Sequence, residues 1–156
     1  MDAFIGTIRA KTDEKGRVFV PASFRKILQS AGEERLILRQ DIYQNCLVLS
    51  PESIWKVELN KLEEQLNKYD EEQQQLFRQF SVLVEMLEID SNGRILIPKD
   101  YLRTASISDT VCFVGMNHVI ELWSPDQLVK SMMNAEELRS RVRKFLCSKP
   151  ANKEPD

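Results

Sequence analysis

Residues 13–21 read Asp-Glu-Lys-Gly-Arg-Val-Phe-Val-Pro, and residues 90–98 read Asp-Ser-Asn-Gly-Arg-Ile-Leu-Ile-Pro. Asp, Gly, Arg and Pro occupy the same positions in both stretches. Asp can accept backbone N–H bonds and Gly permits a positive φ, so Asp-x-x-Gly predicts a tight turn. The apolar residues that follow favour a short strand, which Pro ends. The chain therefore contains two copies of one small unit, and this repeat decides the fold.

Each copy extends in both directions along the chain. Residues 4–11 alternate between apolar and polar side chains, as a half-buried strand does, and residues 82–89 are their counterpart. We interpret each unit as a hairpin whose tip presents Arg17 or Arg94. After each Pro we expect a short amphipathic helix and two further strands, at 36–38 and 46–49 in the first copy and at 111–114 and 119–123 in the second. Both copies end in Ser-Pro, at 50–51 and 124–125, which predicts a helix start.

The segment between the copies predicts a helical hairpin. Its first helix carries apolar residues at spacings of four and three, which places them on one face: Trp55, Leu59, Leu62, Leu66 and Tyr69. Asp70 is expected to cap the second helix. The apolar face packs either on the protein's own sheet or on a neighbouring subunit, and we favour the first. After Ser124-Pro125 we expect a helix, and over 136–149 a charge-dense segment that is a surface helix, an extra basic contact to nucleic acid or a partner-binding helix. A disordered tail is expected over 149–156.

These elements predict an α+β protein. The expected division is a first repeat at 7–54, a helical connector at 55–82, a second repeat at 83–126, and a C-terminal helix with a disordered tail at 127–156. A repeat of this size is marginal for a core of its own, so we expect the two copies to share one.

Composition narrows the class of protein. No run is apolar enough to cross a membrane, and the first residues lack a secretory signal pattern. The three cysteines lack zinc-ligand spacing, so we expect a cytoplasmic protein in which Cys46 and Cys112 are small buried hydrophobes. The single histidine, His118, falls in a predicted turn, and no phosphate-binding Gly-rich loop occurs. We expect no enzyme, cofactor, metal ion or small-molecule substrate, although an enzyme of unknown type stays a weak alternative.

Charge is unevenly distributed. The formal net charge is −2, but residues 9–26 contain six bases and two acids, whereas residues 52–88 contain nine acids and four bases. A basic patch on an acidic body can bind phosphate locally. A solvated surface of mixed charge explains the same counts, and charge alone does not separate the two interpretations.

The repeated Arg also has two interpretations. An Arg that folds back on the Asp of its own turn is a structural device. Around the first turn, however, Lys11, Lys15 and Arg17 crowd together, which favours a negatively charged partner. The second tip, Ser91-Asn92, is nearly neutral. We therefore expect Lys15 and Arg17 to matter more for binding than Arg94.

Several motifs resemble the MraZ family of bacterial transcriptional regulators. They are residues 4–8, 11–25, 46–49, 90–98 and 120–123, within a resemblance that covers roughly residues 4 to 128. The resemblance implies two SpoVT-AbrB-type swapped-hairpin repeats that form a pseudo-twofold unit. It also implies ring-like homo-oligomers, association with the nucleoid, and sequence-specific binding to direct repeats upstream of the division and cell-wall gene cluster, with repression favoured.

The resemblance places the family's Asp-x-x-x-Arg motifs on Asp13/Arg17 and Asp90/Arg94, with Gly16 and Gly93 in the turns. A two-stranded ribbon can enter the major groove of double-stranded DNA, where Arg can bond guanine bidentately. Arg9, Lys11 and Lys15 would neutralise phosphates. The alternative function is an antitoxin-like or scaffold protein-interaction module, in which residues 136–149 wrap a partner.

Overall fold

The computed structural model describes residues 2–147, so the tail expected to be disordered lies outside the described residues. The first copy contains β1 (Thr7–Lys11), β2 (Arg17–Phe19), α1 (Ala22–Ser30), β3 (Arg35–Gln40) and β4 (Leu47–Pro51). The second contains β5 (Val84–Glu88), β6 (Arg94–Leu96), α4 (Lys99–Thr104), β7 (Thr110–Met116) and β8 (Val119–Trp123). Between them lie α2 (Glu52–Gln65) and α3 (Glu71–Val82), and after them come α5 (Pro125–Ser131), α6 (Ala135–Val142) and the π-helical η1 (Arg143–Cys147).

The two copies interleave in one antiparallel sheet with the strand order β1-β7-β8-β4-β3-β5. β1 of the first copy pairs with β7 of the second, and β5 of the second pairs with β3 of the first. The remaining strands β2 and β6 pair with each other as a separate two-stranded ribbon. Exchanging the two copies leaves this pairing scheme unchanged, so the α+β fold has the expected pseudo-twofold arrangement.

The expectation of two local hairpins is wrong. The tight turn forms as predicted, and the N–H of Asp13 bonds the carbonyl of Arg17 at 2.9 Å. Beyond the turn, however, β1 joins the large sheet while β2 joins the ribbon. A sequence pattern specifies a strand and its turn, but burial against the other copy selects the partner strand. The exchange of partners that the family resemblance implies is the arrangement found.

One core serves both copies, as expected. Val18 and Val20 from the first copy and Ile95 and Ile97 from the second are all at most 1% exposed and belong to one hydrophobic cluster. Cys46 and Cys112 form a second cluster with Trp123. Neither cysteine is exposed by more than 1%, which agrees with their expected role as buried hydrophobes.

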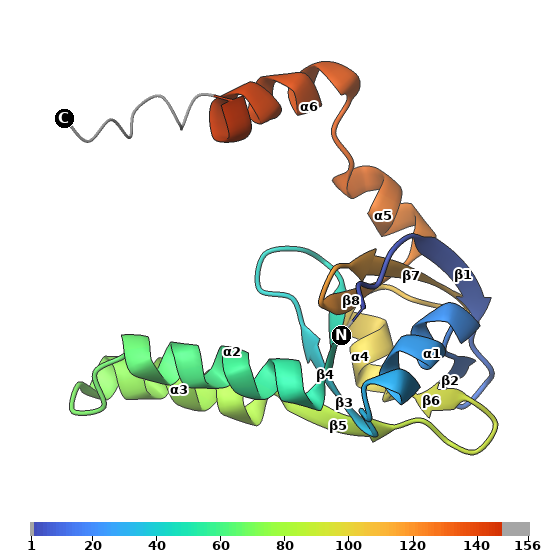
Figure 1. The fold of residues 1–156 in the computed structure, drawn as a ribbon, viewed down its shortest axis with the longest axis horizontal. Coiled ribbons are helices and arrows are strands. Elements are labelled where there is room, and N and C mark those ends of the chain that lie inside the picture. Colours follow the sequence, from blue (N-terminus) through green and yellow to red (C-terminus); the bar gives the residue numbers. More distant parts are fainter. Residues whose placement is uncertain (1, 148–156) are drawn as a thin grey trace.

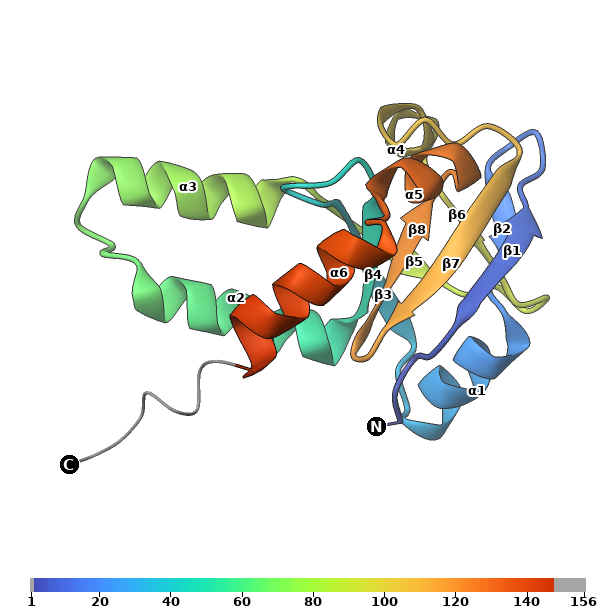
Figure 2. The same ribbon diagram turned by 90° about the horizontal axis from the view of Figure 1, so that it is seen from above.

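Helices α2 and α3 form the expected hairpin, which projects from the body (Figures 1 and 2). Asp70 caps α3 as expected, since its carboxylate accepts the N–H of Gln73 at 3.0 Å. The apolar face predicted for the first helix extends too far along the chain, because α2 ends at Gln65 and Tyr69 is 87% exposed in the following turn. Only Trp55 of that face is buried, because the hairpin extends beyond the sheet that would cover the others.

The two Ser-Pro pairs behave differently. Ser124 caps α5 by accepting the N–H of Gln127 at 3.0 Å, and Pro125 is the first helical residue. Ser50 does not cap α2, because it is buried in β4, where it pairs with Ile37. Helix α2 begins at Glu52, one residue after the predicted first helical residue, and it has no side-chain cap. The helix therefore does not start at Ser50 as predicted, because this residue pairs with β3 in the sheet.

The described part of the chain ends in an arm made of α6 and η1. Asn134 and Glu137 form a capping box at its start, and Figure 1 shows α6 standing away from the body. The helix predicted over 136–149 is present from Ala135 to Cys147, within the described residues. Among residues 2–147, no helix combines the length and apolar character needed to cross a membrane.

Candidate nucleic-acid interface

The first turn holds Arg17 in place through Asp13. One carboxylate oxygen of Asp13 accepts the N–H groups of Lys15 and Arg17, both at 2.9 Å, and the other accepts Nε of Arg17 at 2.7 Å. Gly16 adopts a φ of +95°, which closes the turn. The side chain of Arg17 keeps 37% of its surface exposed, so it is anchored without being covered.

The second turn repeats this geometry. Asp90 accepts the N–H groups of Asn92 and Arg94 at 2.9 Å, and Nε of Arg94 lies 3.2 Å from its second oxygen. Gly93 adopts a φ of +90°. Each Arg thus folds back on the Asp of its own turn, in the first copy and in the second.

Anchoring does not occupy the whole guanidinium group. In both copies the carboxylate bonds Nε, which leaves the two Nη groups outside this pair. The backbone N–H of Arg17 lowers the pKa of Asp13 to about 2, helped by the guanidinium side chain and the N–H of Lys15. The pKa of Asp90 is likewise lowered, first by the backbone N–H of Arg94. Both anchors therefore stay ionised at neutral pH.

The ribbon brings the two anchored arginines onto one surface. Arg17 pairs with Leu96, and Phe19 pairs with Arg94. Side chains alternate across a strand, so Val18 and Ile95 point into the core while these four point outward. Phe19 is 54% exposed and Leu96 is 52% exposed. Figure 1 shows β2 and β6 at the end of the body opposite to the α2–α3 hairpin. The sequence predicted both arginines but not the two exposed apolar residues beside them.

The predicted lysines and Arg9 lie close in the chain to the first turn but on different elements. Lys15 is exposed within the turn itself. Lys11 is the last residue of β1, opposite Thr110, and Arg9 lies opposite Cys112. Because β1 is an edge strand, these exposed bases extend the positive surface from the first turn along the edge of the large sheet.

The second turn receives a base that sequence reasoning did not assign to it. A Cβ atom at Gly93 would collide with the guanidinium group of Arg25 on α1. Arg25 and Lys26 also line a hollow of about 610 Å³ between α1 and residues 89–93. In the other copy, the equivalent position beside Gly16 is occupied by Leu102, which carries no charge. The only available signal was the inclusion of Arg25 in the basic segment 9–26, since its place beside the second turn depends on the interleaved pairing.

One group in the described part of the chain has the composition of a metal site. The ligand atoms of Asp41, Cys46 and Glu121 all lie within 4.8 Å of one another. Asp41 already accepts the N–H groups of Tyr43 and Gln44, and Glu121 accepts the indole N–H of Trp123 at 2.8 Å. Burial raises the pKa of Cys46 to about 12, with help from the two carboxylates, so the thiol stays neutral. These contacts give all three residues a structural role.

His118 lies exposed in the turn between β7 and β8, where a loop residue was expected.

Comparison with known proteins adds the family relationship. Residues 3–77 and 85–142 match the family model described as "MraZ protein, putative antitoxin-like". The chain is 47% identical to the transcriptional regulator MraZ of Bacteroides thetaiotaomicron over 146 residues, which cover 94% of both chains. It is 46% identical to the regulator of the same name from Phocaeicola vulgatus, over 92% of this chain and 93% of the relative. The identity to the MraZ of Rhodospirillum rubrum is 37%, over 84% and 85% respectively. The family match includes both turns, the ribbon and the whole of α6.

Proposed function

Because the chain belongs to the MraZ family of transcriptional regulators, we propose that it acts by binding double-stranded DNA sequence-specifically through the β2–β6 ribbon. One observation carries the proposal: Arg17 and Arg94 stand on adjacent strands of an exposed ribbon, each anchored through Nε by an ionised Asp. An anchored guanidinium loses little conformational freedom on binding, and its Nη groups can bond O6 and N7 of guanine.

The surrounding residues have complementary roles in this proposal. Lys11, Lys15 and Arg9 contact phosphates beside the first turn, and Arg25 does so beside the second. Such contacts fix the position of the ribbon on the duplex, whereas Arg17 and Arg94 read bases. The acidic α2–α3 hairpin lies at the opposite end of the body and turns away from the DNA. With Arg25 counted, the second turn gains positive charge, and Arg94 joins Arg17 as a reading residue.

A single ribbon offers few contacts, so we propose that a ring-like homo-oligomer presents several identical ribbons to spaced direct repeats. The proposed targets lie upstream of the division and cell-wall gene cluster, with repression favoured and with a place in the cytoplasm at the nucleoid. We divide the chain accordingly into repeats at 7–54 and 83–126, a connector at 55–82 and a C-terminal segment at 127–156. Regulation of this kind requires no catalysis.

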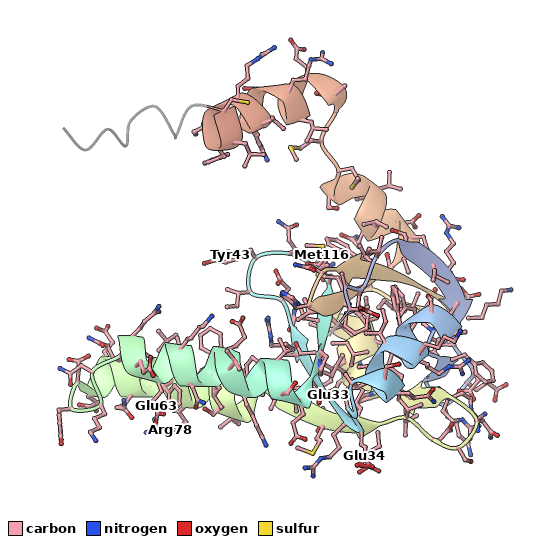
Figure 3. The ribbon with its side chains drawn as sticks, viewed as in Figure 1. Glu33, Glu34, Tyr43, Glu63, Arg78 and Met116 are labelled. Atoms are coloured by element: carbon pink, nitrogen blue, oxygen red, sulfur yellow. The ribbon has the colours of Figure 1, made fainter. Side chains whose placement is uncertain are left out.

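The test is DNA binding by Arg17→Ala and Arg94→Ala proteins. The probe is a duplex taken from upstream of the protein's own gene, measured at two salt concentrations with a scrambled duplex in parallel. Losing one bidentate contact costs about 1–3 kcal/mol, so each variant should lose roughly 5-fold to 150-fold in specific affinity. Arg78→Ala is the matched control, because Arg78 lies exposed on the α2–α3 hairpin (Figure 3). Parental affinity in both ribbon variants would overturn the proposal.

A second function has its own observation. The family description includes "antitoxin-like", and the arm of this chain exposes Leu138, Phe145 and Leu146. An antitoxin-like or scaffold module would hold a different protein on that arm. Copurification of one partner at a fixed ratio in high salt, where phosphate-driven DNA binding fails, would favour this function.

A further inference from the structure

Two of the four outward-facing side chains on the β2–β6 ribbon are apolar. Phe19 is 54% exposed and Leu96 is 52% exposed, whereas the inward-facing Val18 and Ile95 are each 1% exposed. The core does not account for the outward pair, because about half of each side chain faces solvent. Apolar side chains that stand exposed beside charged groups mark a surface that binds a ligand. The ribbon therefore offers apolar contact as well as its two arginines.

The ring of Phe19 lies beside the guanidinium group of Arg94. These residues are partners across the ribbon, and the guanidinium carbon lies 5.9 Å from the ring centre. The carboxylate of Asp90 accepts Nε of the same guanidinium at 3.2 Å, so a carboxylate and a ring together hold the charged group. A base that bonds the Nη groups of Arg94 therefore brings its neighbours in the duplex close to the ring.

The major groove of DNA contains one apolar group that a phenyl ring can cover. All four bases present hydrogen-bonding atoms there, and thymine adds a 5-methyl group. Successive bases of one strand are about 3.4 Å apart along the duplex axis. The 5.9 Å between the guanidinium carbon and the ring centre lies between one and two such steps, so a guanidinium on guanine places the ring over an adjacent base. Covering a methyl group there removes apolar surface of both partners from water.

We infer that the ring of Phe19 contacts the 5-methyl group of a thymine adjacent to the guanine bonded by Arg94. Phe19 is then a specificity-determining residue, which selects thymine over cytosine beside that guanine. Leu96 does not replace the ring at this base, because it lies two residues beyond Arg94 on β6, about 6.6 Å or two base steps along the ribbon. The inference rests on the proposed function, and it adds a second base to the sequence that the ribbon selects.

The experiment removes single methyl groups from the DNA. The probe is the duplex from upstream of the protein's own gene, with each thymine replaced in turn by deoxyuridine, which pairs alike and lacks only the 5-methyl group. Affinity is measured for the parent, for Phe19→Ala and for Leu96→Ala, the matched control of similar exposure. In a second set, cytosine and 5-methylcytosine stand in turn at the position that responds, each paired with guanine.

We expect one thymine per bound repeat at which deoxyuridine lowers the affinity of the parent about 2-fold to 4-fold, the effect of burying one methyl group. The same replacement should not change the affinity of Phe19→Ala, and it should still weaken binding by Leu96→Ala. The parent should bind the duplex with 5-methylcytosine more tightly than the duplex with cytosine, by a similar factor.

The inference is overturned if no thymine responds in the parent, if Phe19→Ala keeps the parental response, if Leu96→Ala loses it equally, or if methylation of cytosine has no effect. An inference that fails alone leaves specific binding and its dependence on Arg94 intact. Failure of the DNA-binding proposal shows separately, as a parent that does not distinguish its own duplex from the scrambled one, and that result overturns both.

Discussion

Arg94 and Phe19 face each other across the β2–β6 ribbon, with the guanidinium carbon of Arg94 lying 5.9 Å from the centre of the Phe19 ring. The opposite pair on the same ribbon, Arg17 and Leu96, has no ring for the guanidinium to approach. The two anchored arginines therefore have different supports. Arg94 is held by Asp90 and by an aromatic face, whereas Arg17 depends on the shorter bond to Asp13.

Replacing Phe19 by Ala should weaken DNA binding more than it weakens the fold. An exposed cation–π contact contributes about 0.5–1 kcal/mol, so specific affinity should fall roughly 2-fold to 5-fold. The unfolding temperature should change little, because the ring is already 54% exposed. Titration of a labelled duplex together with thermal unfolding measures both quantities. Leu96→Ala is the control with equal exposure, and an equal loss of affinity there would show that the ring has no special role.

Gly16→Ala should be far more destabilising than Gly32→Ala. Both glycines have a positive φ, of +95° and +71°. Of the two, only Gly16 has no room for a side chain, because an added Cβ would lie 2.5 Å from the carbonyl oxygen of Ile97. Nothing lies within 4 Å of a Cβ at Gly32. Backbone strain alone predicts about 1–2 kcal/mol at Gly32, and strain plus collision predicts about 2–5 kcal/mol at Gly16. Denaturant unfolding of the two variants gives the comparison, and similar free energies of unfolding would contradict it.

Asp13→Asn should change how stability depends on pH. The pKa of Asp13 is about 2 in the folded chain against 3.8 ordinarily, so the folded state favours the ionised form. The stability linked to this shift is fully present above about pH 4 and is lost as the pH falls through about 2. The parent should therefore exceed the variant at neutral pH, and the gap should close as the solution is acidified. Urea unfolding over this range measures the gap, and a constant gap would exclude Asp13 as its source.

A Cys147→Ser protein should contain no thiol that reacts quickly while folded. Cys147 is the exposed cysteine, whereas Cys46 and Cys112 are buried. Burial also raises the pKa of Cys46 to about 12, so its reactive thiolate is scarce at neutral pH. Ellman's reagent should detect both remaining thiols only after denaturant is added. Rapid reaction of the folded variant would mean that the sheet opens around these cysteines.

Local signals in the sequence identified the turns, the strands and the anchoring of Arg17 and Arg94, because Asp-x-x-Gly-Arg acts within five residues. Such local signals could not predict which strands pair with each other. The swap of β1 to β7 depends on how two apolar faces share a core, and it also brings Arg25 to Gly93. For the same reason the sequence misplaced the helix start at Ser50, where pairing within the sheet overrides a favourable cap.

The exchange of strands between the copies has a consequence for synthesis on the ribosome. β1 emerges first, yet its partner β7 begins at Thr110. At about 5–20 residues per second, the first strand waits roughly 5–20 s for its neighbour. During that interval β1 lacks its native partner strand, and Val18 lacks its partner Ile95 across the ribbon. A nascent chain of this design is exposed to neighbouring nascent chains on the same messenger, and its first half cannot complete folding until nearly the whole sheet has been translated.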